Sequence, residues 1–291
     1  MNYSALIQNR SSVREFSKKK VPDSAVSELK SFYEADCHRL VPELRTELRI
    51  FGTEKRGALE GAAGYQDALP GAPGYLVLLS EQGPWYLENA GFLMEDLILK
   101  LTDLDLKTCW ITYTDSSRVK AALGIDSELS VAAIAAFGYG VKTAKRLRVN
   151  KLSMSNVDIQ AQRRYFAPKK SVEDLVFLQS WGKTSGVEEC IGFYDDLLWE
   201  SFYACSLAPS YLNRQSYGFL LHGSSGHTVT LVSRDDPYNT EIDGKLSLGA
   251  VLLHFTAVAS GWTGKLSWTL GADSADLALP EGCTAVATCR V

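Results

Sequence analysis

The 291-residue chain has only four histidines, and its six cysteines include no C-x-x-C pair. The cysteine spacing matches neither a zinc site nor a dithiol redox motif, so we expect reduced, structural thiols and no bound metal. The first 16 residues, MNYSALIQNRSSVREF, lack the apolar core of a signal peptide. Together with the cysteine usage, this favours a cytoplasmic location.

The chain also lacks a strong charge of either sign, with 30 basic and 34 acidic side chains. No overall field attracts nucleic acid or an anionic membrane, and neither is expected as a partner. One basic run stands out, KTAKRLRVNK at 142–151, which a solvated loop would also explain. The longest uncharged stretch, 246–264, approaches the length of a membrane span, but its histidine, hydroxyls and three glycines favour a central core helix.

Two well-known site motifs are missing. Gly138 and Gly140 do not form G-x-G-x-x-G between a strand and a helix, so a nicotinamide-binding Rossmann domain is not predicted. The segment HGSSGH at 222–227 joins two strand-like runs, and its Gly-Ser-Ser-Gly is typical of a hairpin turn rather than a nucleophile elbow.

A faint internal repeat organises the chain. The strand-like run YLVLLS at 75–80 precedes a helical pattern over 87–106, and TVTLVS at 228–233 precedes another over 243–260. The offset of about 154 residues indicates a duplicated strand-turn-helix unit. We predict an α+β fold with a first repeat at 1–150, a linker at 151–170 and a second repeat at 171–291 that starts with a helix capped at Ser171.

Two segments have the composition of a ligand site. In RSSVR, taken as helical, Arg10 and Arg14 share one face, and with Ser12 they could bind a phosphate or form an ordinary basic surface. In ACSLAPSYLNRQSYGF at 204–219, hydroxyls and amides stand beside aromatic rings. That composition suits a planar heterocycle, and equally a helix C-terminus that leads into a strand.

Together these segments resemble the nitroreductase family of flavin mononucleotide (FMN) enzymes. QNRSSVREF is similar to its R-x-S-x-R-x-F signature, and APSYLNRQSYGF to its A-P-S-x-x-N-x-Q-P-W segment. DLKTCWI and AAFGYG followed by KRLR resemble two further family elements. Only the first half carries the arginine signature, and only the second carries the A-P-S segment. The resemblance therefore implies a nitroreductase-like fold whose two repeats form a single-chain pseudo-dimer with one FMN site.

The resemblance also implies which residues contact FMN. The phosphate is expected to meet Arg10, Ser12 and Arg14, with further charge from Lys145, Arg146 or Arg148. The ring is expected to lie against Pro209, Ser210, Asn213 and Gln215, while the backbone of Ile111, Thr112 and Tyr113 approaches flavin N5. Ser216-Tyr217 replaces the family's Pro-Trp, which alters the expected shape of the ring pocket.

The implied activity is ping-pong hydride transfer from NADH or NADPH through FMN to a small-molecule acceptor such as a nitroaromatic or quinone. No catalytic side chain is required, since flavin N5 carries the chemistry. The chain is expected to act as a monomer. The alternatives are a degenerate member that binds flavin or another flat ligand without turnover, and a flavin-dependent deiodinase or dehydrogenase.

Overall fold

The computed structural model describes residues 1–66, 68–141, 146–151, 157–162, 167–187, 196–223, 228–271 and 277–291. The first sheet has four strands in the order β1-β2-β4-β3, formed by β1 (Thr46–Gly52), β2 (Gly74–Ser80), β3 (Lys107–Ile111) and β4 (Ser130–Gly138). The second has five strands in the order β10-β11-β9-β8-β7. Its strands are β7 (Val176–Leu178), β8 (Tyr217–His222), β9 (Thr228–Arg234), β10 (Thr269–Leu270) and β11 (Cys283–Arg290).

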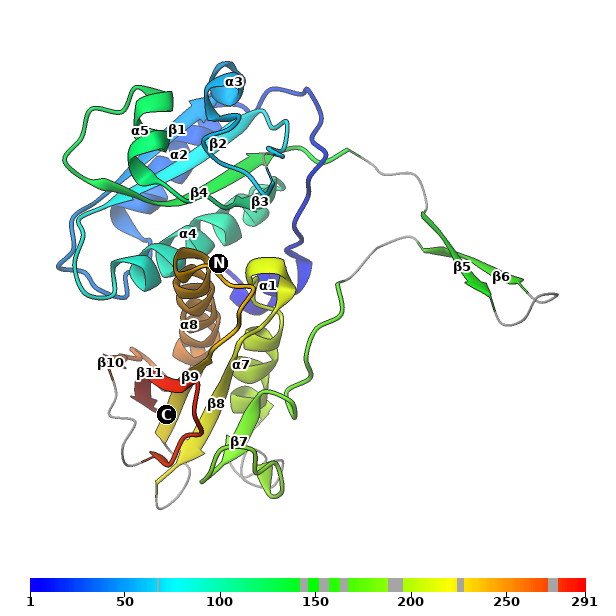
Figure 1. Ribbon diagram of the computed structural model, residues 1–291, viewed down its shortest axis with the longest axis vertical. Helices are drawn as coiled ribbons and strands as arrows, with labels where there is room; N and C mark the ends of the chain where they lie inside the picture. The colour runs from blue at the N-terminus through cyan, green and yellow to red at the C-terminus, as the bar shows by residue number, and fades with distance from the viewer. Residues whose placement is uncertain are drawn as a thin grey trace.

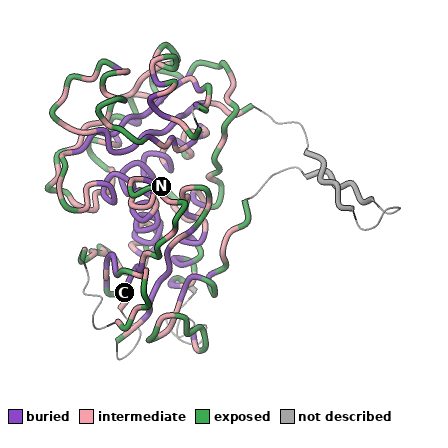
Figure 2. The backbone as a smooth tube through the Cα atoms, viewed as in Figure 1, coloured by how far each residue is buried: buried purple, intermediate pink, exposed green. Residues whose placement is uncertain are grey.

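Two long helices pack against each other between the sheets (Figure 1), namely α4 (Tyr86–Asp103) and α8 (Glu241–Thr263). Each follows an inner strand of its own sheet, since β2 precedes α4 and β9 precedes α8. Figure 2 shows that burial is concentrated along this helix pair and the strands on either side. The expected α+β fold with two related strand-turn-helix units is therefore confirmed.

Two glycines allow α4 and α8 to approach closely. A Cβ atom at Gly249 would overlap the carbonyl oxygen of Glu88, and one at Gly91 would overlap that of Leu246. Helix backbones come this near only where no side chain intervenes. The helix pair is therefore held by backbone contact across the two halves.

The apolar helix α8 is long and apolar enough to cross a membrane, but 67% of its most apolar window is buried inside the fold. It packs against the aromatic and aliphatic side chains of the second-half core, in which Phe202 and Phe219 contact Phe255 of α8. This is the burial expected of a central helix that is apolar on all sides.

The shorter helices pack against the central helix pair, the first sheet or one another. They are α1 (Tyr3–Asn9), α2 (Asp23–Ala35), α3 (Arg56–Leu59), α5 (Ser116–Leu123) and α7 (Asp196–Ser206), with 3-10 turns η1 (Thr53–Lys55) and η2 (Tyr211–Asn213). Helix α2 starts at Asp23 directly after Pro22, and the acidic side chain lies in its first turn.

The helix expected from Ser171 was wrong. Ser171 and Asp174 do form the capping contact, with Ser171 Oγ 3.1 Å from Asp174 Oδ2. However, Val176 N donates to Val172 O within a single turn, and the chain then enters strand β7. The helix does not continue, because the backbone groups of β7 form strand hydrogen bonds with β8 and cannot also form helical ones.

A two-stranded hairpin connects the halves. Strands β5 (Arg146–Lys151) and β6 (Val157–Gln162) pair antiparallel and project away from both sheets (Figure 1). The hairpin spans the position where the first repeat was expected to end, so the proposed boundary at residue 150 falls within β5.

Candidate functional site

The N-terminal helix α1 belongs in space to the second half. Ile7 is 2% exposed and lies in the core cluster that includes Phe202 and Phe255. The helix ends at Asn9, and Arg10 has extended backbone angles, φ −64° and ψ 133°. The expected helical face shared by Arg10 and Arg14 was therefore wrong, and the signature lies on an extended segment that returns to the first half.

That segment runs along the ends of β3 and β4. Ser12 forms a parallel bridge with Thr108, and Val13 N donates to Thr108 O at 2.8 Å. Further along, Phe16 forms a bridge with Gly140. The three first-half segments singled out in the sequence, RSSVR, TCWI and FGYG, thus lie side by side, with Ser12 and Arg14 exposed.

The side chain of Arg10 turns inward. It is 7% exposed, and its Nε lies 3.3 Å from Glu95 Oε1 of α4. Neither Nε nor Nη1 has a hydrogen-bond partner among the described residues, although both atoms are buried. Buried donors without partners are costly, so this guanidinium is suited to receive an additional acceptor.

Glu95 links Arg10 to the second half. Its carboxylate is fully buried, accepts a hydrogen bond from Trp110 Nε1 at 3.0 Å and lies 3.0 Å from His254 Nε2. His254 Nδ1 in turn lies 2.8 Å from the carbonyl oxygen of Ala204. A carbonyl only accepts, so Nδ1 carries a proton and the imidazole bridges the two halves. His254, the histidine of the uncharged stretch 246–264, is therefore paired at both ring nitrogens.

The A-P-S segment forms a tight loop after α7. Ser210 Oγ accepts from the backbone N of Gln215 at 3.0 Å, and Asn213 Nδ2 donates to Pro168 O at 2.6 Å. Leu212 and Asn213 have positive φ angles of 49° and 57°. Such angles are uncommon outside glycine, so the loop is held in one shape by these contacts.

Gln215 has an internal role. It is 1% exposed, its Oε1 accepts from Lys170 N at 2.9 Å, and its Nε2 donates to Ser206 O at 2.8 Å. The amide is thus engaged on both sides within the second half, and it fixes the base of the A-P-S loop rather than facing outward.

The two halves meet again beside the end of β3. Thr112 Oγ1 donates to Asp243 Oδ2 at 2.7 Å, and burial raises the pKa of that carboxyl. Tyr211 of the A-P-S loop packs edge-on against Tyr65, with ring centroids 6.3 Å apart. Ile111 and Tyr113 are buried, and Tyr113 donates its hydroxyl to Val131 O. Only the backbone of this stretch can therefore serve a ligand.

The basic run after β4 leads into the hairpin. Lys145 is outside the described residues, and the backbone of Arg146 and Arg148 belongs to β5, in the hairpin that projects from the body (Figure 1). A different cation lies near Arg10. Lys169 Nζ donates to Ala208 O at 2.8 Å, and burial, followed by the charge of Arg10, lowers the pKa of Lys169 to about 8.

Four residues of this region were not found from the sequence, namely Glu95, Lys169, Asp243 and His254. Glu95 and His254 are polar residues inside apolar helical patterns, which is a usable signal because buried polar groups need partners. Lys169 carried no signal beyond its position in a basic linker.

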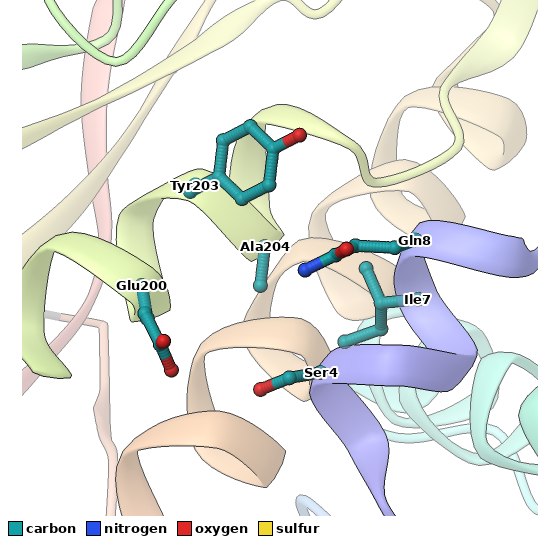
Figure 3. Close-up of a pocket in the computed structure, with 6 residues that line it drawn as sticks. All are labelled: Ser4, Ile7, Gln8, Glu200, Tyr203 and Ala204. Carbon is teal, nitrogen blue, oxygen red and sulfur yellow. The ribbon is translucent and has the colours of Figure 1, made fainter.

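A small hollow lies between α1 and α7 (Figure 3). It measures about 20 Å³ and is lined by side chains that include Gln8, Glu200 and Tyr203. That volume is room for about one water molecule, so the hollow cannot hold a flavin ring.

Comparison with known proteins agrees with this architecture. The family model described as "Putative TM nitroreductase" matches residues 2–172, more than half of the chain. The crystal structure of a "putative nitroreductase" from Thermotoga maritima covers 100% of this chain and 94% of its own, with a TM-score of 0.59 and 17% identity. A nitroreductase family protein from Clostridium novyi covers 48% of this chain and 87% of its own, with a TM-score of 0.43 and 18% identity. No curated protein gave a match.

The whole-chain likeness shows the fold, and the range matched by the family model includes the arginine signature, the TCWI strand and α4, the first helix of the central pair. The chain belongs to this nitroreductase family, with the α+β fold arranged as two related halves in one polypeptide.

Proposed function

We propose that the protein is an FMN-dependent NAD(P)H oxidoreductase with one flavin site between its two halves. The observation that carries this proposal is the buried Arg10 guanidinium, whose Nε and Nη1 have no hydrogen-bond partner among the described residues. It lies at the start of the exposed Ser12–Arg14 segment, within electrostatic range of Lys169, which contacts the A-P-S loop. Family membership supports an oxidoreductase, and the residues present fit an anionic cofactor.

The chain's own residues would bind and orient the cofactor. Arg10, Ser12 and Arg14 offer charged and hydroxyl donors to a phosphate, and the charges of Arg10 and Arg14 both reach the Cys109 thiol of β3, lowering its pKa against the larger effect of burial. Pro209, Ser210 and Asn213 present a rigid loop to the ring. FMN supplies, when bound, the hydride transfer between a reduced nicotinamide and an electron-poor acceptor.

The visible spectrum of the purified protein, with and without added FMN, tests this function directly. We expect one FMN per chain and bleaching by NADH or NADPH under anaerobic conditions, because only one half carries each part of the site. A chain that binds no FMN would contradict the proposal, and a ratio of two would contradict the shared single site. We also propose a cytoplasmic monomer that reduces small nitroaromatic or quinone-like molecules.

Binding without bleaching would favour the second candidate, a member that holds flavin without turnover. The observation in its favour is the Ser216-Tyr217 pair, in which Tyr217 is buried and donates its hydroxyl to Cys205 O. The Ser216-Tyr217 pair therefore contributes a side chain to the protein core, whereas a segment that only binds a ligand would leave that side chain free to contact the flavin ring.

Arg14→Ala is expected to weaken FMN binding by about 1.5–3 kcal/mol, since a charge-assisted hydrogen bond to phosphate contributes that much. Fluorescence titration of FMN measures the change. Lys18→Ala removes an exposed cation from the same segment and is the matched control. Equal affinity in the Arg14 variant and the wild type would reject the phosphate role.

A further inference from the structure

The linker between the two halves places the ammonium group of Lys169 beside the A-P-S loop. Lys169 Nζ donates to the carbonyl oxygen of Ala208, the first residue of the A-P-S segment, at 2.8 Å. The same ammonium lies within electrostatic range of Arg10 from α1 and Glu95 from α4. Lys169 thus contacts the A-P-S loop of the second half and lies within electrostatic range of the arginine signature of the first.

The charges around this point do not balance. Arg10 and Lys169 contribute two positive charges, and Glu95 contributes one negative charge that it also shares with Trp110 and His254. An excess buried cation is unfavourable unless an anion compensates it. Arg10 Nη1, which has no hydrogen-bond partner among the described residues, provides a donor for such an anion, and an ammonium has three N–H bonds, of which Lys169 uses one on Ala208.

The backbone of the basic hairpin lies apart from this point. Arg146 and Arg148 lie on β5, whose backbone projects away from α1 and the sheets (Figure 1). A cation additional to Arg10 and Arg14 is available from another part of the chain, because Lys169 lies within electrostatic range of Arg10.

We propose that Lys169 and Arg10 together bind the phosphate group of the flavin, so that the linker between the repeats completes the cofactor site. This inference rests on the proposed function. The anion chemistry is that of a phosphate monoester, which a free inorganic phosphate shares. Because Lys169 contacts Ala208 and Arg10 contacts Glu95 of α4, phosphate binding to both cations would also fix the A-P-S loop against the first half.

The pH dependence of binding follows from the same contacts. The pKa of Lys169 is lowered to about 8 by burial and by Arg10, while Glu95 opposes the shift. Below that pH the ammonium is charged and attracts phosphate, and above it the charge is lost. FMN affinity should therefore fall as the pH rises through about 8, whereas binding of riboflavin, which has no phosphate, should not.

The test uses the full-length protein and the variants Lys169→Met and Lys169→Arg, with FMN, riboflavin and inorganic phosphate as probes. Lys169→Met is expected to weaken FMN binding about 10- to 100-fold, the factor typical of one charge-assisted hydrogen bond, and to abolish the pH dependence near 8. Riboflavin binding should be unchanged, and Lys169→Arg should retain part of the affinity. Lys183→Met, which removes an exposed lysine charge, is the matched control.

The outcomes separate the two proposals. Wild-type protein that binds FMN while Lys169→Met binds it equally well would overturn the role of Lys169 and leave the flavin function standing. Equal weakening of FMN and riboflavin would also overturn the phosphate assignment. Wild-type protein that binds inorganic phosphate through Lys169 but takes up no flavin would support the anion site and contradict the flavin function.

Discussion

Gly249→Ala is expected to destabilise the protein by about 3 kcal/mol, as overpacking of a tight interface does. The added methyl would overlap the carbonyl oxygen of Glu88 and lie 2.7 Å from the backbone N of Phe92. Neither is a flexible side chain, so α4 and α8 would have to move apart. Thermal unfolding followed by circular dichroism should show a melting temperature lower by roughly 5–10 °C.

The same helix provides the control. A Cβ at Gly261 meets nothing within 4 Å, and Gly261 is exposed near the end of α8. Gly261→Ala should therefore raise stability slightly, because alanine has the higher helix propensity. A Gly249 variant as stable as the Gly261 variant would show that the halves do not meet through their helix backbones.

Glu95→Ala is expected to cost about 3–5 kcal/mol, the range for breaking a buried ion pair by removing one partner. The substitution leaves Arg10 buried without its carboxylate and removes acceptors from Trp110 and His254. Chemical denaturation of the flavin-free protein measures this effect apart from any cofactor binding. Glu95→Gln, which keeps the side-chain shape, should lower the free energy of unfolding by a smaller amount.

Two comparisons make this prediction specific. Glu241→Ala removes a carboxylate from an exposed pair with Lys245, and little change is expected because surface ion pairs are screened. The double variant Arg10→Met with Glu95→Leu should be more stable than Glu95→Leu alone, since it leaves no uncompensated arginine. If the losses of unfolding free energy from the two substitutions simply added in the double variant, a direct coupling between Arg10 and Glu95 would be contradicted.

The sequence was most informative where packing imposes a regular period. The runs at 75–80 and 228–233 predicted β2 and β9, and the apolar helical patterns predicted α4 and α8, because inner strands and core helices have little freedom in composition. The helix predicted at Ser171 is absent because a capping contact needs only one turn. The backbone that follows pairs with β8 as strand β7.

In the candidate site, too, the sequence identified some residues and only the structure identified others. Its motif residues, such as Arg10 and Ser210, could be named from sequence because they occur in compact local patterns. Glu95 and Lys169 could not, since one is a single acid within a long apolar helix and the other a single lysine in a basic linker. Their relevance depends on which groups from distant segments lie beside them.

By itself, the sequence determined the α+β class, the two-fold repeat and the family signature, because these depend on periodicity and short motifs that each segment carries independently. Only the tertiary structure decided that α1 packs on the second half, that Arg10 is buried against Glu95 and that Lys169 contacts Ala208. Those contacts join residues separated by tens to more than a hundred positions, and they form only when close packing of α4 and α8 brings the two halves together.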